Sequence, residues 1–199
     1  MTDIVKILAG ELGIKTAQVE ATIKLIDEGN TIPFISRYRK EVTGSLNDEI
    51  LRQFDERLKY LRNLEEKKTQ VLSAIEEQGK LTDELKKEIE AAITLVAVDD
   101  LYRPFRPKRR TRAMIAVEKG LEGFANDIFE EKLEKDATDE AKKYLSDKEG
   151  LEVETEADAI AGAMDIIAEK ISDDAGFRNK IRDLSFKQGI LTSVAKDET

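Results

Sequence analysis

The stretch from Leu46 to Gln78 contains neither Pro nor Gly, the two residues that most readily interrupt a helix. Apolar residues recur along it at alternating spacings of three and four, which is the period of one face of an α-helix. The stripe consists of Leu51, Phe54, Leu58, Leu61, Leu72 and Ile75, and Glu65 and Lys68 interrupt it. The pattern predicts one helix over most of 46–78, about 50 Å long at 1.5 Å per residue. Because of the polar interruption, the stripe is not a pure coiled-coil seam.

Apolar residues at helical spacing also occur before this stretch. Over 4–28 we expect a helix hairpin that turns at Gly13, with Thr16 as the N-cap of its second helix. Gly29 suits the left-handed position after that helix. Pro33 suits the first turn of a further short helix, which Gly44 ends.

A second helix is expected to pack antiparallel against the long one. Gly79 separates the two, Thr82 is a suitable N-cap, and one apolar face follows. The residues of that face are Leu85, Ile89, Ile93 and Val96. Pro104 and Pro107 then exclude regular helix between about 99 and 106.

The remaining chain again shows helical periodicity. We expect helix to resume near Lys108 with Met114 and Val117 facing inward, followed by shorter helices over about 121–132 and 138–146. The sequence TEAD at 155–158 has the form of a capping box and opens a helix. Its inward residues are expected to be Ala159, Ala163, Ile166 and Ile167, and a last helix covers about 174–187.

The predicted fold class is all-α, a multi-helix array with a long central helix hairpin. We divide the chain into an N-terminal helical part over 1–44 and a larger helical region over 45–189. Residues 190–199 begin with ILTSV, whose β-type residues predict the start of a strand that leads to domains outside this chain.

Composition excludes several classes of chemistry. The chain has no Cys and no His, so thiolate nucleophiles, thiolate zinc sites and imidazole bases are excluded. No phosphate-binding glycine loop occurs, and we expect neither an enzyme nor a bound metal or cofactor. The first residues lack the features of a secretory signal, and no apolar run approaches the length of a membrane span. We therefore expect a cytoplasmic protein without a membrane partner.

Two segments carry positive charge that helix amphipathicity does not require, although the net charge is −9. The first, TIPFISRYRKE at 31–41, contains Arg37, Arg39 and Lys40 around Tyr38. The second, YRPFRPKRRTRA at 102–113, contains Arg103, Arg106, Lys108, Arg109, Arg110 and Arg112. Arginine donors match phosphate oxygens and aromatic rings stack on bases, so both segments are candidates for binding nucleic acid.

The alternative is that these cations pair with the surplus of acidic residues and hold helices together. Glu41, Asp99 and Asp100 are the nearest candidate partners in the sequence. On this reading the chain is a structural scaffold, and its acidic net charge repels nucleic acid at long range. The position of the carboxylates relative to the arginines distinguishes the two readings.

Three blocks of sequence resemble the signature blocks of the Tex family of bacterial transcription accessory proteins. They are NTIPFISRYRKEVTGSLNDEILR at 30–52, DLYRPFRPKRRTRAMIAVEKGLE at 100–122 and ADAIAGAMDIIAE at 157–169. The blocks are long, lie in order and extend over nearly the whole chain. One departure is GLEGFA at 120–125, where Gly123 and Phe124 replace an expected Pro and Leu.

The resemblance implies more than the residues alone. It implies that the chain is the N-terminal helical region of a protein several times longer, with a helix-turn-helix-like part near its start. The further domains implied are an RNase H-like domain, a helix-hairpin-helix segment and a C-terminal OB-fold that binds RNA. The partners it implies are RNA or DNA, RNA polymerase or other transcription factors, and those remaining domains.

Overall fold

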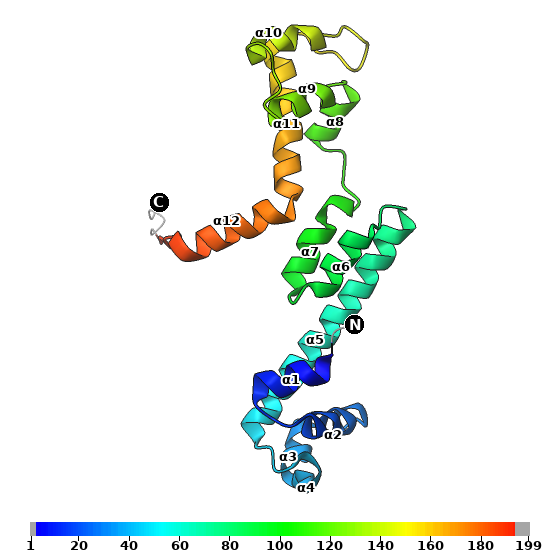
Figure 1. Ribbon diagram of the computed structural model, residues 1–199, viewed down its shortest axis with the longest axis vertical. Coiled ribbons are helices and arrows are strands. Elements are labelled where there is room, and N and C mark those ends of the chain that lie inside the picture. Colours follow the sequence, from blue (N-terminus) through cyan, green and yellow to red (C-terminus); the bar gives the residue numbers. More distant parts are fainter. Residues whose placement is uncertain (1–2, 194–199) are drawn as a thin grey trace, which may run out of the picture. The chain divides into compact units, whose positions relative to one another are not determined.

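The computed structural model describes residues 3–193, which form an all-helical array (Figure 1). Among these residues the only extended pairing is an isolated antiparallel bridge between Ser146 and Val153. The predicted all-α class is therefore confirmed. The chain forms two compact units, residues 1–99 and 100–199. The domain boundaries predicted at 44/45 and 189/190 differ from this division.

The first unit contains six helices and the start of a seventh. They are α1 (Ile4–Leu12), α2 (Thr16–Asp27), α3 (Ile32–Tyr38), α4 (Lys40–Thr43), α5 (Asp48–Glu77), α6 (Asp83–Ala91) and α7 (Leu95–Tyr102). The 30-residue helix α5 confirms the long helix predicted from the sequence. Its N-cap is Asn47, whose side chain accepts a hydrogen bond from the Ile50 amide at 2.8 Å.

Helices α1, α2 and α3 lie against the N-terminal part of α5, and α4 packs on α2 and α3. One cluster joins Leu8 of α1 and Val19 of α2 to Phe54, Leu58 and Leu61 of α5. A second cluster contains Leu25, Ile35, Leu46 and Leu51. The short helices that carry the first basic segment are thereby fixed to a long helix.

The hairpin of α1 and α2 turns as predicted, with Gly13 at φ 64° and Gly29 at φ 84°. The predicted N-cap is wrong by one residue, because Lys15 precedes the helix and Thr16 is its first residue. The Gln18 side chain accepts a hydrogen bond from the Lys15 amide at 3.1 Å. A side-chain cap from Thr16 is therefore not required at this helix start.

The polar interruption of the α5 stripe has a structural reason. Lys68 is buried, and its ammonium group donates to the Glu90 carbonyl at 2.8 Å and pairs with Glu65 at 3.1 Å. Leu64 and Val71 are also buried, although the predicted stripe omitted them. The charged position thus ties α5 to the end of α6.

The helix after Thr82 is shorter than predicted. Thr82 caps it as expected, but α6 ends at Ala91 and Ile93 is 75% exposed. The Thr94 hydroxyl accepts from the Ala97 amide at 3.1 Å and begins α7, which turns Val98 inward and leaves Val96 exposed. The predicted burial of Ile93 and Val96 is therefore wrong, because a new cap resets the helix register.

The second unit begins within α7. Its elements are η1 (Arg103–Phe105), α8 (Arg112–Glu118), α9 (Glu122–Phe129), α10 (Ala137–Ala141), η2 (Lys142–Tyr144), α11 (Glu156–Asp173) and α12 (Ala175–Gln188). The capping box at Thr155 and Asp158 is confirmed, as is the last helix. Residues 190–193 have no regular structure, and Val194 lies outside the described residues, so the strand stays a prediction.

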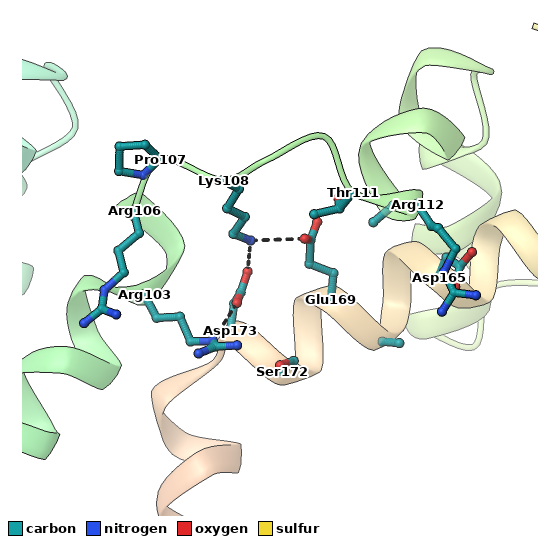
Figure 2. Close-up of a pocket in the computed structure, with 12 residues that line it drawn as sticks. Arg103, Arg106, Pro107, Lys108, Thr111, Arg112, Asp165, Glu169, Ser172 and Asp173 are labelled. Carbon is teal, nitrogen blue, oxygen red and sulfur yellow. Dashed lines mark hydrogen bonds and ion pairs between the residues drawn. The ribbon is translucent and has the colours of Figure 1, made fainter.

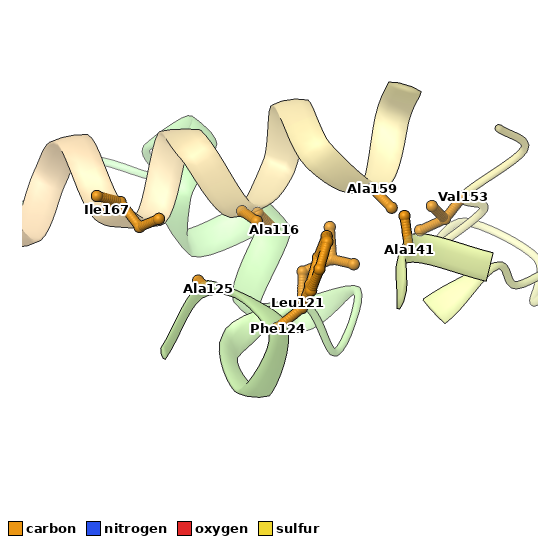
Figure 3. Packing of buried hydrophobic residues seen from close by; sticks show 9 residues of the cluster. Ala116, Leu121, Phe124, Ala125, Ala141, Val153, Ala159 and Ile167 are labelled. Carbon is orange, nitrogen blue, oxygen red and sulfur yellow. The ribbon is translucent and has the colours of Figure 1, made fainter. Parts of the chain in front are cut away.

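Helix α11 is the element on which α8, α9 and α10 pack (Figure 3). Its Ala159, Ala163 and Ile167 face inward, as predicted. Phe124 is fully buried and stacks on Tyr144 at 4.9 Å, so α9 forms where the sequence departs from the family pattern. A β-carbon at Gly162 would lie 2.4 Å from a Leu121 methyl group, and this glycine therefore permits close contact.

The inward face of α8 was predicted wrongly. Met114 and Val117 are 42% and 41% exposed, whereas Ala113 and Ala116 are buried. Large apolar residues mark an inward face only where the neighbouring helix leaves room for them. Here α8 lies so close to α11 that alanine occupies the interface.

Candidate nucleic-acid interface

The first basic segment lies on α3, α4 and the junction between them. Pro33 occupies the first turn of α3, as predicted, and Ile35 anchors the helix in the core. The Gln18 side chain donates to the Thr43 carbonyl at 2.9 Å and so ties α2 to the end of α4. Gly44 ends α4 in the left-handed conformation at φ 64°.

Within residues 3–193, no carboxylate pairs with the cations of this segment. Arg37 and Lys40 are exposed, and neither forms an ion pair with any residue in the described range 3–193. Arg39 lies over the Phe34 ring at 5.0 Å and donates to the Tyr38 carbonyl at 2.9 Å. Glu41, the partner suggested by the sequence, forms no ion pair with them in this part of the structure. The charge of the segment therefore faces solvent.

The second basic segment runs from the end of α7 to the start of α8. Contrary to the prediction, residues 99–102 are helical and Pro104 lies in the 3₁₀ turn η1. Pro104 is tolerated there because an amide at the start of such a turn requires no acceptor. The chain becomes extended at Arg106, directly before Pro107, as expected for a residue that precedes proline. Helix resumes at Arg112, where Thr111 caps α8, rather than near Lys108.

Most of the cations in this second segment are paired. Asp173 accepts from Arg103 at 3.1 Å and from Lys108, which also pairs with Glu169 at 3.3 Å (Figure 2). Arg112 lies 3.7 Å from Asp165. A separate pair joins Arg110 to Glu118.

Three of these carboxylates share one face of α11. Asp165, Glu169 and Asp173 are four residues apart, and this spacing places side chains on the same side of a helix. The basic segment lies along this face and the two line a cavity of about 500 Å³ (Figure 2). Because both signs of charge line the cavity, it is not a simple anion site.

Lys108 shows the effect of this arrangement on protonation. Burial lowers the pKa of Lys108, but the hydrogen bonds to Asp173 and Glu169 outweigh burial and raise the pKa above its ordinary value. The ammonium form is thus stabilised by its partners within the chain.

Arg106 and Arg109 are the other two cations of the second segment, and both are exposed. Arg106 lies over the Tyr102 ring at 5.5 Å. Arg109 is exposed and has no ion-pair partner among residues 3–193. Arg109 is therefore open to a phosphate.

Sequence reasoning missed an ion cluster at the beginning of the second unit. Asp100 is buried and accepts from Arg178 at 2.6 Å and from Arg182 at 2.7 Å. Burial raises the pKa of Asp100, but these two arginines outweigh burial and hold the pKa below its ordinary value. The available signal was the spacing of the two arginines, four apart on α12.

The two basic segments belong to different compact units, the first to residues 1–99 and the second to residues 100–199. Across residues 3–193 no group of three or more acidic side chains is arranged to hold a metal ion. The same range contains no helix that is both long and apolar enough to span a membrane. What the geometry defines is a helical protein with one solvent-facing basic segment and one that is largely neutralised.

Comparison with known proteins identifies the family. A model of the Tex-like protein N-terminal domain matches residues 2–76, and a model of the Tex central region matches residues 132–199. The chain therefore belongs to the Tex family, as the three sequence blocks indicated.

Named relatives agree with this assignment. Transcriptional accessory protein Tex of Neisseria gonorrhoeae is 46% identical over 91% of this chain and 23% of its own length. Uncharacterized protein YdcI of Bacillus subtilis is 44% identical over 94% of this chain and 26% of its own length. The human S1 RNA-binding domain-containing protein 1 is 30% identical over 98% of this chain and 19% of its own length. The chain thus spans about a quarter or less of these relatives.

Proposed function

We propose that this chain is a non-catalytic helical part of a cytoplasmic transcription accessory protein and that it contributes phosphate-binding surface for RNA or DNA. The observation that carries the proposal is the first basic segment, where Arg37 and Lys40 are exposed without a carboxylate partner in the described structure. The names of the relatives, which refer to transcription and to an RNA-binding domain, support it.

In this proposal the second basic segment contributes fewer phosphate contacts than the first. Arg109 is available, whereas carboxylates already offset the charge of Arg103, Lys108, Arg110 and Arg112. Any phosphate contact by these four residues therefore competes with an ion pair inside the chain.

The experiment compares two triple variants in binding a fluorescein-labelled single-stranded oligonucleotide across a range of salt concentrations. Each phosphate contact lowers the slope of log affinity against log salt by about 0.7 on a single strand. We expect Arg37→Ala, Arg39→Ala and Lys40→Ala together to flatten the slope by about 1.4, the contribution of the two exposed cations Arg37 and Lys40. The combination of Arg109→Ala, Arg110→Ala and Arg112→Ala should flatten it by about 0.7, the contribution of one contact.

A matched control removes the same charge elsewhere. Lys80, Lys86 and Lys87 are exposed on or beside α6, and replacing all three by Ala changes the net charge equally. If this control flattens the slope as much as the first triple variant does, the surface is nonspecific and the proposal is wrong.

A structural scaffold is the second candidate function. It is favoured by the paired cations of 103–112 and by α12, which exposes Phe177, Ile181, Leu184 and Phe186. On this proposal the chain docks the remaining domains of a longer protein or RNA polymerase. If the parent chain binds no oligonucleotide even at about 50 mM salt, where phosphate contacts are strongest, the scaffold function replaces the phosphate-binding one.

A further inference from the structure

Tyr38 is an exposed aromatic residue among the cations of the first basic segment. It is 60% exposed at the last position of α3, directly between Arg37 and Arg39 in the chain. Exposed aromatic rings beside cations are the elements with which proteins bind single strands, since every base has a face that stacks on a ring.

The Tyr38 ring packs against a second aromatic ring of the same helix. Phe34 lies one helical turn before Tyr38, and the two ring centroids are 5.3 Å apart at an angle of 48°. The guanidinium of Arg39 covers the Phe34 ring. Phe34 thus supports the tyrosine while Tyr38 keeps most of its own surface open to solvent.

The backbone that carries the ring is also fixed. Ile35 of α3 is completely buried, and Thr43 is completely buried at the end of α4. The hydrogen bonds of Gln18 to the Thr43 and Gly44 carbonyls close the segment against α2. A ring on a fixed helix loses little conformational freedom on binding, which favours its use as a contact surface.

We propose that Tyr38, with Arg37 and Lys40, forms a binding site for a short single-stranded nucleic acid, in which one base stacks on the tyrosine ring. The site rests on the nucleic-acid binding proposed above and specifies its ligand. A duplex base exposes no free face to the ring, so the tyrosine contributes to single strands alone. The two exposed cations contact the flanking phosphates, and the acidic net charge of −9 limits the footprint to a few nucleotides.

The test uses the full 199-residue chain and a labelled 12-nucleotide oligothymidine, with a 12-base-pair duplex as the comparison probe. We expect Tyr38→Ala to weaken binding of the single strand by about 5- to 150-fold, the range measured for loss of a stacked base. Binding of the duplex and the salt slope should not change, because no charge is removed. Tyr38→Phe should retain the affinity, because stacking requires the ring and not the hydroxyl.

Tyrosine fluorescence supplies a readout that a structural role would not give. The chain has four Tyr and no Trp, so its emission reports the tyrosines directly. Oligothymidine should quench the parent, and Tyr38→Phe should bind equally well with less quenching. Circular dichroism of each variant provides the control for folding.

The outcomes separate the two proposals. If the parent binds neither probe, both the proposed function and this site are wrong. If the parent binds oligothymidine and Tyr38→Ala binds it equally well, nucleic-acid binding stands and the stacking site is overturned. Equal losses of single-strand and duplex binding in Tyr38→Ala would also overturn it, because the ring would then act through the fold.

Discussion

The two basic segments have similar compositions and different structural situations. In 31–41 the cations Arg37 and Lys40 face solvent beside Tyr38, without a carboxylate partner in the part of the chain that is described. In 102–113 Arg103, Lys108 and Arg112 meet a row of carboxylates on α11. Charge density along the sequence therefore does not measure how much charge a surface presents. Among the described residues, the shorter segment with fewer cations is the one whose charge carboxylates offset less.

The largest effect should come from the ion cluster that begins the second unit. Replacing both Arg178 and Arg182 by Ala leaves the carboxylate of Asp100 buried without these two partners. We expect a loss of about 3–5 kcal/mol in the free energy of unfolding, measured with urea, as for other unpaired buried charges. Arg52→Ala, which removes an exposed pair with Asp48, should cost less than about 1 kcal/mol. If the double variant and Arg52→Ala lose the same unfolding free energy, the buried cluster at Asp100 stabilises the protein no more than an exposed ion pair does.

A smaller loss is expected within the second basic segment. Asp173→Ala removes the shared partner of Arg103 and Lys108, and its side chain is only 14% exposed. Charge-assisted hydrogen bonds of this kind predict a loss of about 1–3 kcal/mol in unfolding free energy. Asp165→Ala should cost less, because its partner Arg112 is 86% exposed on the side chain. If Asp165→Ala lowers the unfolding free energy more than Asp173→Ala does, Asp165 and not Asp173 is the more stabilising partner of the second segment.

The first basic segment should respond in the opposite way. Arg37→Ala and Lys40→Ala each remove an exposed cation, so each should change the unfolding free energy by no more than about 0.5 kcal/mol. The same variants should weaken oligonucleotide binding. A variant that unfolds at much lower urea and binds like the parent would show that these cations are structural.

The smallest effect should be that of pH near neutrality. The pKa of Asp100 is held below its ordinary value of 3.8, so its stabilisation is present above that value and is lost as acid lowers the pH through the shifted pKa. The pKa of Lys108 is raised above 10.5, so its contribution is present below that value and is lost at still higher pH. Urea midpoints should therefore be constant between about pH 5 and 9. Asp100→Asn should reduce the loss in acid, whereas an unchanged acid limb would assign that loss to other carboxylates.

Two features of the fold, the length of one helix and the start of another, were predictable because they depend on local signals. The length of α5 follows from apolar periodicity without Pro or Gly, and the start of α11 follows from the capping box at Thr155. Both signals act over a few residues, and the structure retains both. The family also followed from blocks of sequence, each longer than ten residues.

The faces of the shorter helices were less predictable, because the shape of the neighbouring helix decides them. Alanines of α8 replace Met114 and Val117 in the interface with α11, which periodicity alone does not indicate. The ion partners were equally hidden. The suggested partner Asp100 pairs with Arg178 and Arg182 of α12. Carboxylates of residues 165–173 and Glu118 pair with cations of the second segment, and none of them was suggested by the sequence.

The close approach at Gly162 has a consequence for how this family changes over time. The space that a side chain at this position would need is occupied by a Leu121 methyl group and, at 3.4 Å, by the β-carbon of Ala116. Substitutions at these three positions are therefore not independent. A lineage that gains a side chain at 162 retains the packing of α8 on α11 only if the residue at 121 becomes smaller. Among relatives, the residues at positions 121 and 162 should therefore vary together. The sum of their side-chain volumes should be conserved more strongly than the volume at either position.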